Sequence, residues 1–199
     1  MENKEFIESY FYEMSECIRN MPVEAIDTTI EMLFQAYQRG SQVFICGNGG
    51  SASTATHFAA DLLKGTIVEG QKRFKVHCLN DNIPLVSALT NDVGFDNLYY
   101  EQLKSLFVED DILICLSVHG GAGQDKAGQW SQNLLKAMNY AGESEGKTIG
   151  FSGFDGGPMK EIADICVVVP VDSTPHVESL HLALEHLICN CLRKKISES

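Results

Sequence analysis

The first forty residues carry apolar side chains at helical spacing in two successive segments. Residues 3–20 place them three or four positions apart, and Pro22, which cannot continue a helix, follows. Residues 23–38 repeat the pattern and stop at Gly40, a common residue just after a helix. The pattern predicts two amphipathic helices that need an apolar partner, and a helix bundle between subunits is one way to bury them.

From residue 43 onward, short apolar runs alternate with helical patterns. The runs predict strands over 43–46, 75–79, 112–116, 148–151 and 165–169. The helical patterns predict helices over 51–64, 83–90, 96–107, 128–141, 158–163 and 174–195, and residues 91–95 are predicted to form a loop. Strands that are apolar throughout and alternate with helices are typical of a parallel sheet covered on both faces. We therefore expect an α/β fold, and we interpret residues 1–199 as one domain because no linker or repeat interrupts the pattern.

The composition narrows the class of protein. Of the 199 residues, 44% are hydrophobic and 21% are charged, as is usual for a soluble globular protein. No apolar run is long enough to span a bilayer, and the acidic first residues lack the features of a signal peptide. We therefore expect a cytoplasmic protein that does not contact membranes. Its seven scattered cysteines include no Cys-x-x-Cys pair, so we interpret them as reduced, buried thiols.

The net charge of −12 argues against nucleic acid as a direct partner, because nucleic-acid-binding proteins normally present a basic surface. The densest basic cluster, Arg193-Lys194-Lys195, is better explained as cations at the end of the last helix.

A glycine-rich segment follows the first predicted strand and precedes a predicted helix. It reads Gly47-Asn48-Gly49-Gly50-Ser51. Glycines allow the backbone to approach a ligand closely, and a helix start offers unpaired N–H groups to an anion. The dinucleotide fingerprint is absent because Ala52 stands at its third glycine, and no Gly-Lys-Ser/Thr follows. The segment therefore indicates a phosphate site of another kind, with a simple tight turn as the alternative.

Two imidazole–carboxylate pairs add candidate chemistry. His57 and Asp61 are four residues apart on the helix after the glycine segment, so they share a helix face. A second pair occurs near the C-terminus on another predicted helix. A second glycine-rich segment, 117–123, follows the predicted strand 112–116, and ligands of parallel sheets bind at this carboxyl end of the strands.

Five segments together carry a resemblance to a known family. They are Cys46-Gly-Asn-Gly-Gly-Ser51, His57-Phe-Ala-Ala-Asp61, Asn91-Asp-Val-Gly-Phe95, Ser152-Gly-Phe-Asp-Gly-Gly157 and Val177-Glu-Ser-Leu-His-Leu-Ala-Leu-Glu-His186. In this order they resemble the sugar isomerase (SIS) domain proteins and, within them, the phosphoheptose isomerases. The resemblance extends over nearly the whole chain, including the two N-terminal helices.

The resemblance implies a three-layer αβα sandwich around a five-stranded parallel sheet. It also implies a homotetramer with active sites between subunits, in which residues 1–40 take part in oligomerisation. The implied substrate is a sugar phosphate, sedoheptulose 7-phosphate in the phosphoheptose isomerases, and the implied cofactor is zinc. The substrate-binding positions it implies are Asn48, Gly49, Gly50, Ser51, Asn91, Asp92, Ser117, His119 and Gly120.

The resemblance also implies the metal ligands and the acid–base residues. The metal positions are His57, Asp61, Glu178 and His186, where the family has His, Glu, Gln and His. Asp61 and His186 would share the proton transfers. Aldose–ketose isomerisation moves a proton between C1 and C2 through an enediol, so it needs a proton shuttle and an electrophile that holds the developing oxyanion. Two imidazoles with one or two carboxylates form a reasonable zinc set.

Helix geometry constrains this set. Glu178 and His186 are eight residues apart, which on a straight helix is a rise of about 12 Å and a rotation of about 80°. One ion would bind both only if the helix start unwinds near Pro175 or if adjacent subunits contribute. We interpret His181 and Glu185, on the same helix, as structural residues.

The chain departs from the family at several of these positions. Asp61 is one methylene shorter than Glu, and Glu178 adds a negative charge. The segment Ser117-Val118-His119-Gly120-Gly121-Ala122 lacks the hydroxyl-rich pattern with which the family binds phosphate. Backbone N–H groups, with His119 or Lys126, are the alternative phosphate ligands. The alternatives to an isomerase are a non-catalytic SIS tetramer that senses a sugar phosphate, or one that binds a protein to regulate replication initiation.

Overall fold

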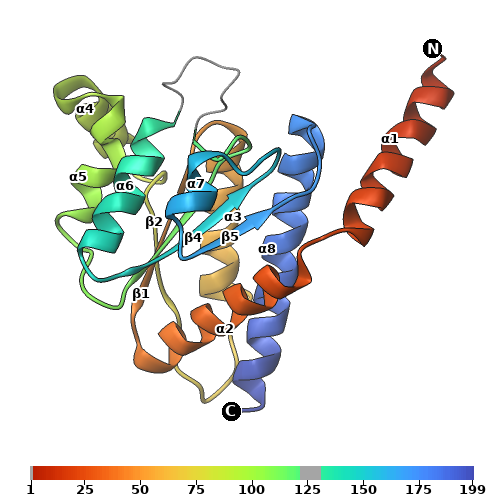
Figure 1. The fold of residues 1–199 in the computed structure, drawn as a ribbon. Helices are drawn as coiled ribbons and strands as arrows, with labels where there is room; N and C mark the ends of the chain where they lie inside the picture. Colours follow the sequence, from red (N-terminus) through yellow and green to blue (C-terminus); the bar gives the residue numbers. More distant parts are fainter. Residues whose placement is uncertain (1, 122–130) are drawn as a thin grey trace.

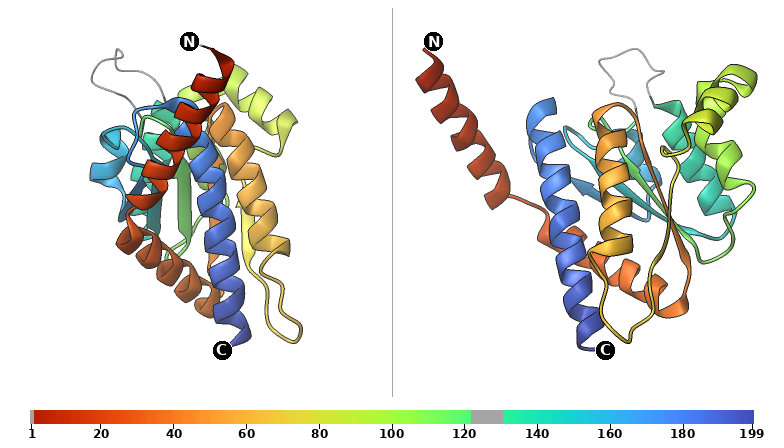
Figure 2. Two further views of the ribbon diagram at one scale, coloured as in Figure 1. Left: turned by 90° about the vertical axis from the view of Figure 1, so that its right-hand side faces the viewer. Right: turned by 180° about the vertical axis from the view of Figure 1, so that it is seen from behind.

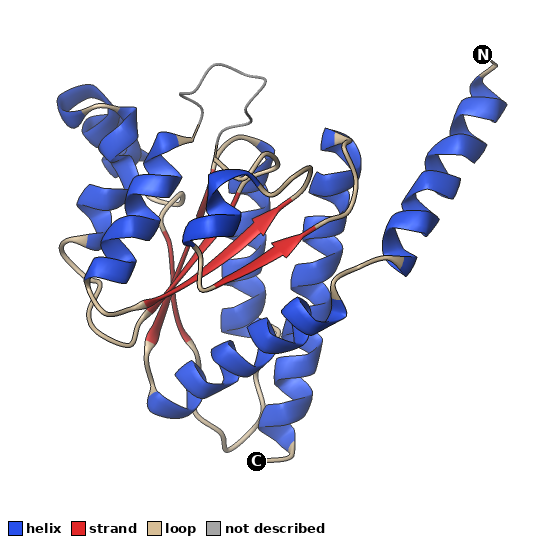
Figure 3. Cartoon of the chain, in the orientation of Figure 1, coloured by secondary structure: helices blue, strands red, loops and turns tan. Residues whose placement is uncertain are grey.

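The computed structural model describes residues 2–121 and 131–199, which form a five-stranded sheet between two layers of helices (Figure 1). The strands are β1 (Gln42–Gly47), β2 (Lys75–Cys78), β3 (Ile112–Leu116), β4 (Lys147–Ser152) and β5 (Ile165–Val168). All pairings are parallel, in the order β2-β1-β3-β4-β5, and Cys46 pairs with Cys115 in the two central strands. The predicted α/β fold and its five strands are confirmed (Figure 3).

The helices divide between the two faces of the sheet. They are α1 (Asn3–Arg19), α2 (Val23–Arg39), α3 (Gly50–Lys64), α4 (Ile83–Val93), α5 (Leu98–Leu103), α6 (Gln132–Glu143), α7 (Gly157–Ile162) and α8 (Thr174–Ser197). Val43 and Ile45 point into a core with α2, α3 and α8, whereas Phe44 and Cys46 point into a core with α4 to α7. Both faces are therefore buried, which explains why the central strand β3 is apolar throughout.

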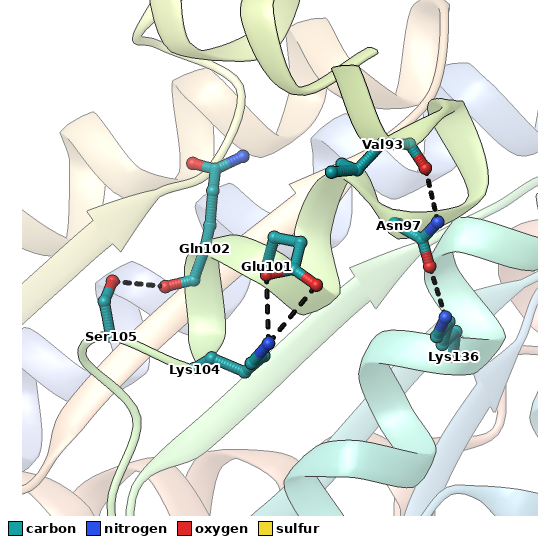
Figure 4. A network of polar contacts seen from close by, with 7 residues as sticks. All are labelled: Val93, Asn97, Glu101, Gln102, Lys104, Ser105 and Lys136. Atoms are coloured by element: carbon teal, nitrogen blue, oxygen red, sulfur yellow. Dashed lines mark hydrogen bonds and ion pairs between the residues drawn. The ribbon is translucent and has the colours of Figure 1, made fainter. Parts of the chain in front are cut away.

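The segment between β2 and β3 differs in detail from its prediction. The expected loop 91–95 is helical at its start, because α4 continues to Val93 and ends before Gly94, whose φ is 86°. The expected helix 96–107 is a 3₁₀ turn followed by the short α5. Asn97 connects this corner to its surroundings: it donates to the Val93 carbonyl and accepts a hydrogen bond from Lys136 on α6 (Figure 4).

The predicted helix 128–141 is confirmed from Gln132, while its expected start lies outside the described residues. None of the helices in the described ranges combines the length and hydrophobicity that crossing a membrane requires.

The two N-terminal helices differ in how far they are buried. α2 packs its apolar face against α8 and β5, so it finds a partner within the chain. α1 extends away from the body (Figure 1), and Phe6, Phe11 and Tyr12 are 59%, 67% and 66% exposed. Tyr10 holds α1 to α8 by stacking on His176 at 4.2 Å between ring centroids. The expected need for an outside partner therefore applies to α1.

α3 and α8 lie side by side on one face of the sheet (Figure 2). Their N-terminal turns meet where Gly50 lies against the carboxylate of Glu178. Further along, Asp61 lies near His186. The two helices thus run in the same direction, and equivalent turns of each face one another.

Candidate metal and acid–base site

Four side chains from α3 and α8 form a cluster, consisting of His57, Asp61, Glu185 and His186. One potential ligand atom from each lies within 4.8 Å of all the others. His57 and Asp61 are one turn apart on α3, whereas Glu185 and His186 are neighbours on α8. The structure thus brings together three of the four predicted metal ligands within one subunit and adds Glu185.

The two carboxylates of this cluster approach the imidazoles differently. Glu185 Oε1 lies 3.3 Å from His186 Nε2 and 3.8 Å from His57 Nδ1. Asp61 Oδ2 lies 3.7 Å from His186 Nε2 and 3.9 Å from His57 Nε2. The carboxylates therefore face opposite nitrogens of the His57 ring but the same nitrogen of His186.

Glu185 is the most unusual member of the cluster. Its side chain is 1% exposed, and neither carboxylate oxygen has a hydrogen-bond partner among the described residues. Burial, together with the negative charge of Asp61, raises the pKa of Glu185 to about 8. A buried carboxylate without donors is unfavourable unless a cation compensates it. Two imidazoles and two carboxylates within this distance of one another fit a divalent metal such as zinc.

His181 lies one turn before Glu185 and differs from it. Its Nε2–H donates to the Ser152 carbonyl at 3.1 Å, and Nδ1 is buried. Burial lowers the pKa of His181 to about 4, so its ring is neutral near pH 7. These contacts agree with the structural role expected for His181. The sequence analysis also assigned a structural role to Glu185, from its helix face alone. Its position next to His186 in the sequence could have indicated that it belongs to the site.

Glu178 lies outside this cluster in the described chain. Its carboxylate is so close to Gly50, at the first turn of α3, that a Cβ at that glycine would collide with it. α8 is helical from Thr174, so its start does not unwind to bring Glu178 toward His186. Of the two expected routes to a shared ion, this leaves a contribution from an adjacent subunit, and the role of Glu178 as a ligand stays a prediction.

A network of side-chain hydrogen bonds supports the first glycine segment. The side-chain amides of Asn48 and Asn133 exchange hydrogen bonds of 2.9 and 3.0 Å, and Tyr99 donates to both Asn48 Oδ1 and the Gly47 carbonyl. Asn80 also donates to the Gly47 carbonyl. Asn48 therefore supports the loop, while its role in substrate binding stays a prediction. Sequence spacing gave no signal for these supporting residues.

The backbone next to this network is exposed at the start of α3, and its role as an anion site stays a prediction. Gly49, with φ of 57°, and Gly50 are exposed at the start of α3, and Ser51 is buried in its first turn. Glycine adopts this φ without the penalty that other residues incur.

The described part of the second glycine segment, residues 117–121, is packed against the rest of the chain. Ser117 is buried, and its hydroxyl accepts a hydrogen bond from the Gly121 N–H at 3.2 Å. Gly120, with φ of 62°, faces the Gly156 carbonyl so closely that a Cβ would not fit. His119 lies with its ring 4.2 Å from that of Phe154. Lys126, the other expected phosphate ligand, lies outside the described residues.

Asn91 and Asp92 are exposed near the end of α4, and Asn91 donates to Asp92 at 2.8 Å. Their described contact is with each other and not with the α3–α8 cluster. Their expected role in substrate binding stays a prediction.

Comparisons with known proteins agree with the fold. The chain matches the SIS domain family over residues 9–153. It is 41% identical over 170 residues to the lincomycin biosynthesis protein LmbN of Streptomyces lincolnensis, covering 83% of this chain but only 61% of that protein. It is 35% identical over 171 residues to a phosphoheptose isomerase of Helicobacter pylori, covering 86% and 84% of the two chains.

A solved structure extends this similarity to nearly the whole chain. The structure of a phosphoheptose isomerase from Francisella tularensis superposes with a TM-score of 0.85 at 26% identity, covering 98% of this chain and 100% of that one. The chain therefore belongs to the SIS domain family and, within it, to the phosphoheptose isomerase family.

Proposed function

We propose that this protein interconverts sedoheptulose 7-phosphate and D-glycero-D-manno-heptose 7-phosphate through an enediol. The observation that carries the proposal is the α3–α8 cluster, in which two imidazoles and two carboxylates meet in a chain of the phosphoheptose isomerase family. These are the groups that transfer protons in aldose–ketose isomerisation.

The reaction needs two linked proton movements. A base removes a proton from C1 of the ketose, which leaves an enediolate; C2 then gains a proton while the proton on the C1 oxygen moves to the C2 oxygen. Asp61 and His186 share these transfers. Their Oδ2 and Nε2 atoms are 3.7 Å apart, and both side chains are partly exposed, so one substrate can reach both.

A divalent metal fits the same cluster. The residues that would hold it are among His57, Asp61, Glu185 and His186, with Glu178 of an adjacent subunit as the other predicted ligand. Zinc, when bound, supplies the positive charge that stabilises the enediolate oxygen.

The substrate phosphate is proposed to bind at the carboxyl ends of β1 and β3. The exposed backbone of Gly49 and Gly50 at the start of α3 offers N–H groups, and Ser51 adds a hydroxyl in the same turn. From the second segment, Ser117, His119 and Gly120 are the proposed contacts, with Asn91 and Asp92 near the sugar. Because Glu178 lies beside Gly50, its negative charge opposes a phosphate at that point, which favours phosphate binding toward β3.

We further propose a single-domain cytoplasmic protein that assembles as a homotetramer with sites at subunit interfaces. The exposed apolar side chains of α1 support this assembly, because such a helix is stabilised by burial against other subunits. Residues 1–40 would then supply the oligomer contacts. Analytical ultracentrifugation of the full chain tests this, with a monomer as the contradicting result.

Incubation with sedoheptulose 7-phosphate in deuterated buffer, with and without zinc, tests the activity by NMR. We expect an aldoheptose phosphate carrying solvent deuterium, and His186→Ala should abolish both. A panel of ketose phosphates of other chain lengths belongs in the same experiment, because the relative LmbN is named for lincomycin biosynthesis. No deuterium exchange with any of them, in a folded and zinc-supplied protein, would contradict the proposal.

A further inference from the structure

The cluster offers two different three-residue sets to one metal ion, because His57 presents a different nitrogen to each carboxylate. One set consists of His57 Nδ1, Glu185 Oε1 and His186 Nε2. The other consists of His57 Nε2, Asp61 Oδ2 and His186 Nε2. A single ion can use only one nitrogen of His57, so the two sets are alternatives.

The distances favour the set that contains Glu185. Ligand atoms around a tetrahedral zinc lie about 3.3 Å apart, given bonds of about 2.0–2.1 Å. Glu185 Oε1 is 3.3 Å from His186 Nε2 and 3.8 Å from His57 Nδ1. The corresponding distances from Asp61 Oδ2 are 3.7 and 3.9 Å. The Glu185 set therefore needs the smaller adjustment.

Solvation favours the same set. The Glu185 side chain is 1% exposed, neither oxygen is hydrogen-bonded among the described residues, and the groups facing it are the two imidazoles, so a metal ion held by the same three side chains would compensate its charge. The Asp61 side chain is 28% exposed, so water already solvates it. A carboxylate that remains accessible is the one that a substrate can reach for proton transfer.

We propose that Glu185 is the carboxylate ligand of the metal and forms a His–Glu–His site with His57 and His186 inside one subunit, which leaves Asp61 unligated as the proton-transfer base. This inference rests on the proposed function for the role of Asp61, and it assigns to Asp61 the transfers that were shared with His186, because a metal-bound Nε2 has no lone pair left for a proton. Two histidines, one glutamate and an open fourth position form a known arrangement of catalytic zinc sites. Glu178, against Gly50 at the start of α3, then has no part in metal binding.

The test compares three variants that each replace a carboxylate by its amide: Glu185→Gln, Asp61→Asn and Glu178→Gln. Zinc content after dialysis and zinc affinity by competition with a chromophoric chelator are measured on the full-length protein. We expect Glu185→Gln to lose at least about 100-fold in affinity, and the other two to stay within about threefold of the unchanged protein. Substitution with cobalt adds a spectrum that reports the ligand set, so activity is not the only readout.

Circular dichroism and thermal unfolding establish that each variant is folded. If Glu185→Gln does not fold, the other two variants still decide, because loss of zinc from Asp61→Asn or Glu178→Gln overturns the inference. It is also overturned if the unchanged protein binds no zinc. If Asp61→Asn retains zinc and exchanges deuterium at the unchanged rate, Asp61 is not the base. If the zinc affinities of the variants are as expected but the unchanged protein has no isomerase activity, only the proposed function is refuted.

Discussion

The α3–α8 cluster and the glycine segments at the strand ends differ in whether their polar side chains are hydrogen-bonded within the chain. In the cluster, Glu185 is buried and neither of its carboxylate oxygens is hydrogen-bonded among the described residues; the groups facing it are the imidazoles of His57 and His186. In the glycine segments, the polar side chains satisfy one another: Asn48 pairs with Asn133, and Ser117 accepts from Gly121. In the proposed function, side chains therefore act on the ligand at the cluster, whereas the segments contribute mainly their backbone.

The largest expected effect comes from removing a histidine of the cluster. His186→Ala should lower kcat by about 1,000-fold or more, because the metal loses one of its two histidine ligands. The NMR assay with a ketose phosphate measures it, and unfolding curves should remain close to those of the unchanged protein because the side chain is 46% exposed. Activity within tenfold of normal would remove the cluster from the chemistry.

Next in size is a substitution in the packed second segment. Gly120→Ala should destabilise the protein by about 3 kcal/mol or more, because φ is 62° and the added Cβ would meet the Gly156 carbonyl. Gly49→Ala is the matched control: its φ is 57° but nothing lies near its Cβ, so we expect only about 1–2 kcal/mol. Urea unfolding measures both, and equal losses would show that the second segment is not tightly packed.

The third effect is a pH dependence of the free energy of unfolding, and it comes from His181. Its pKa is lowered to about 4 by burial, whereas in the unfolded chain it is near 6.5. The unfolded state therefore binds the proton first, so this contribution to stability is complete above pH 6.5 and is lost as the pH falls toward 4. Its size is on the order of 3 kcal/mol.

The free energy of unfolding of the unchanged protein and of His181→Gln, measured from pH 7 to pH 4, tests this effect. The variant should lose less stability over this range. Parallel curves for the two proteins would contradict a buried neutral His181.

The smallest effect concerns the hydrogen-bond network of Asn48 and Asn133 that supports the first glycine segment. Asn48→Ala should cost about 1–2 kcal/mol of stability, because it leaves the amide of Asn133 without its partner. Asn91→Ala removes an exposed hydrogen bond and should change stability by less than about 0.5 kcal/mol. If thermal unfolding shows the two variants to be alike, the network does not support the loop.

The fold could be predicted from the sequence because short, mostly apolar runs mark the strands and apolar residues at helical spacing mark the helices between them. The predicted helix boundaries were wrong where tertiary contacts determine them. One example is Asn97, whose hydrogen bonds to Val93 and Lys136 shape the corner before α5. His57 and Asp61 were found through their spacing on one helix. Glu185 was missed as a site residue because the helix period alone does not reveal that α3 packs beside it and covers its carboxylate.

The support of the first glycine segment was also out of reach from the sequence. Asn48 and Asn133 are 85 residues apart, and only the packing of α6 against the sheet brings them together. Whether the segment binds phosphate depends on its backbone and on a ligand, so that prediction remains to be tested.

The most direct test of the account is the position of zinc in crystals of the full-length protein, located by anomalous scattering at the zinc edge. The account predicts one peak per subunit between His57, Glu185 and His186, with Asp61 beyond bonding distance. A peak bonded to Asp61 or to Glu178 of an adjacent subunit, with Glu185 unligated, would contradict it.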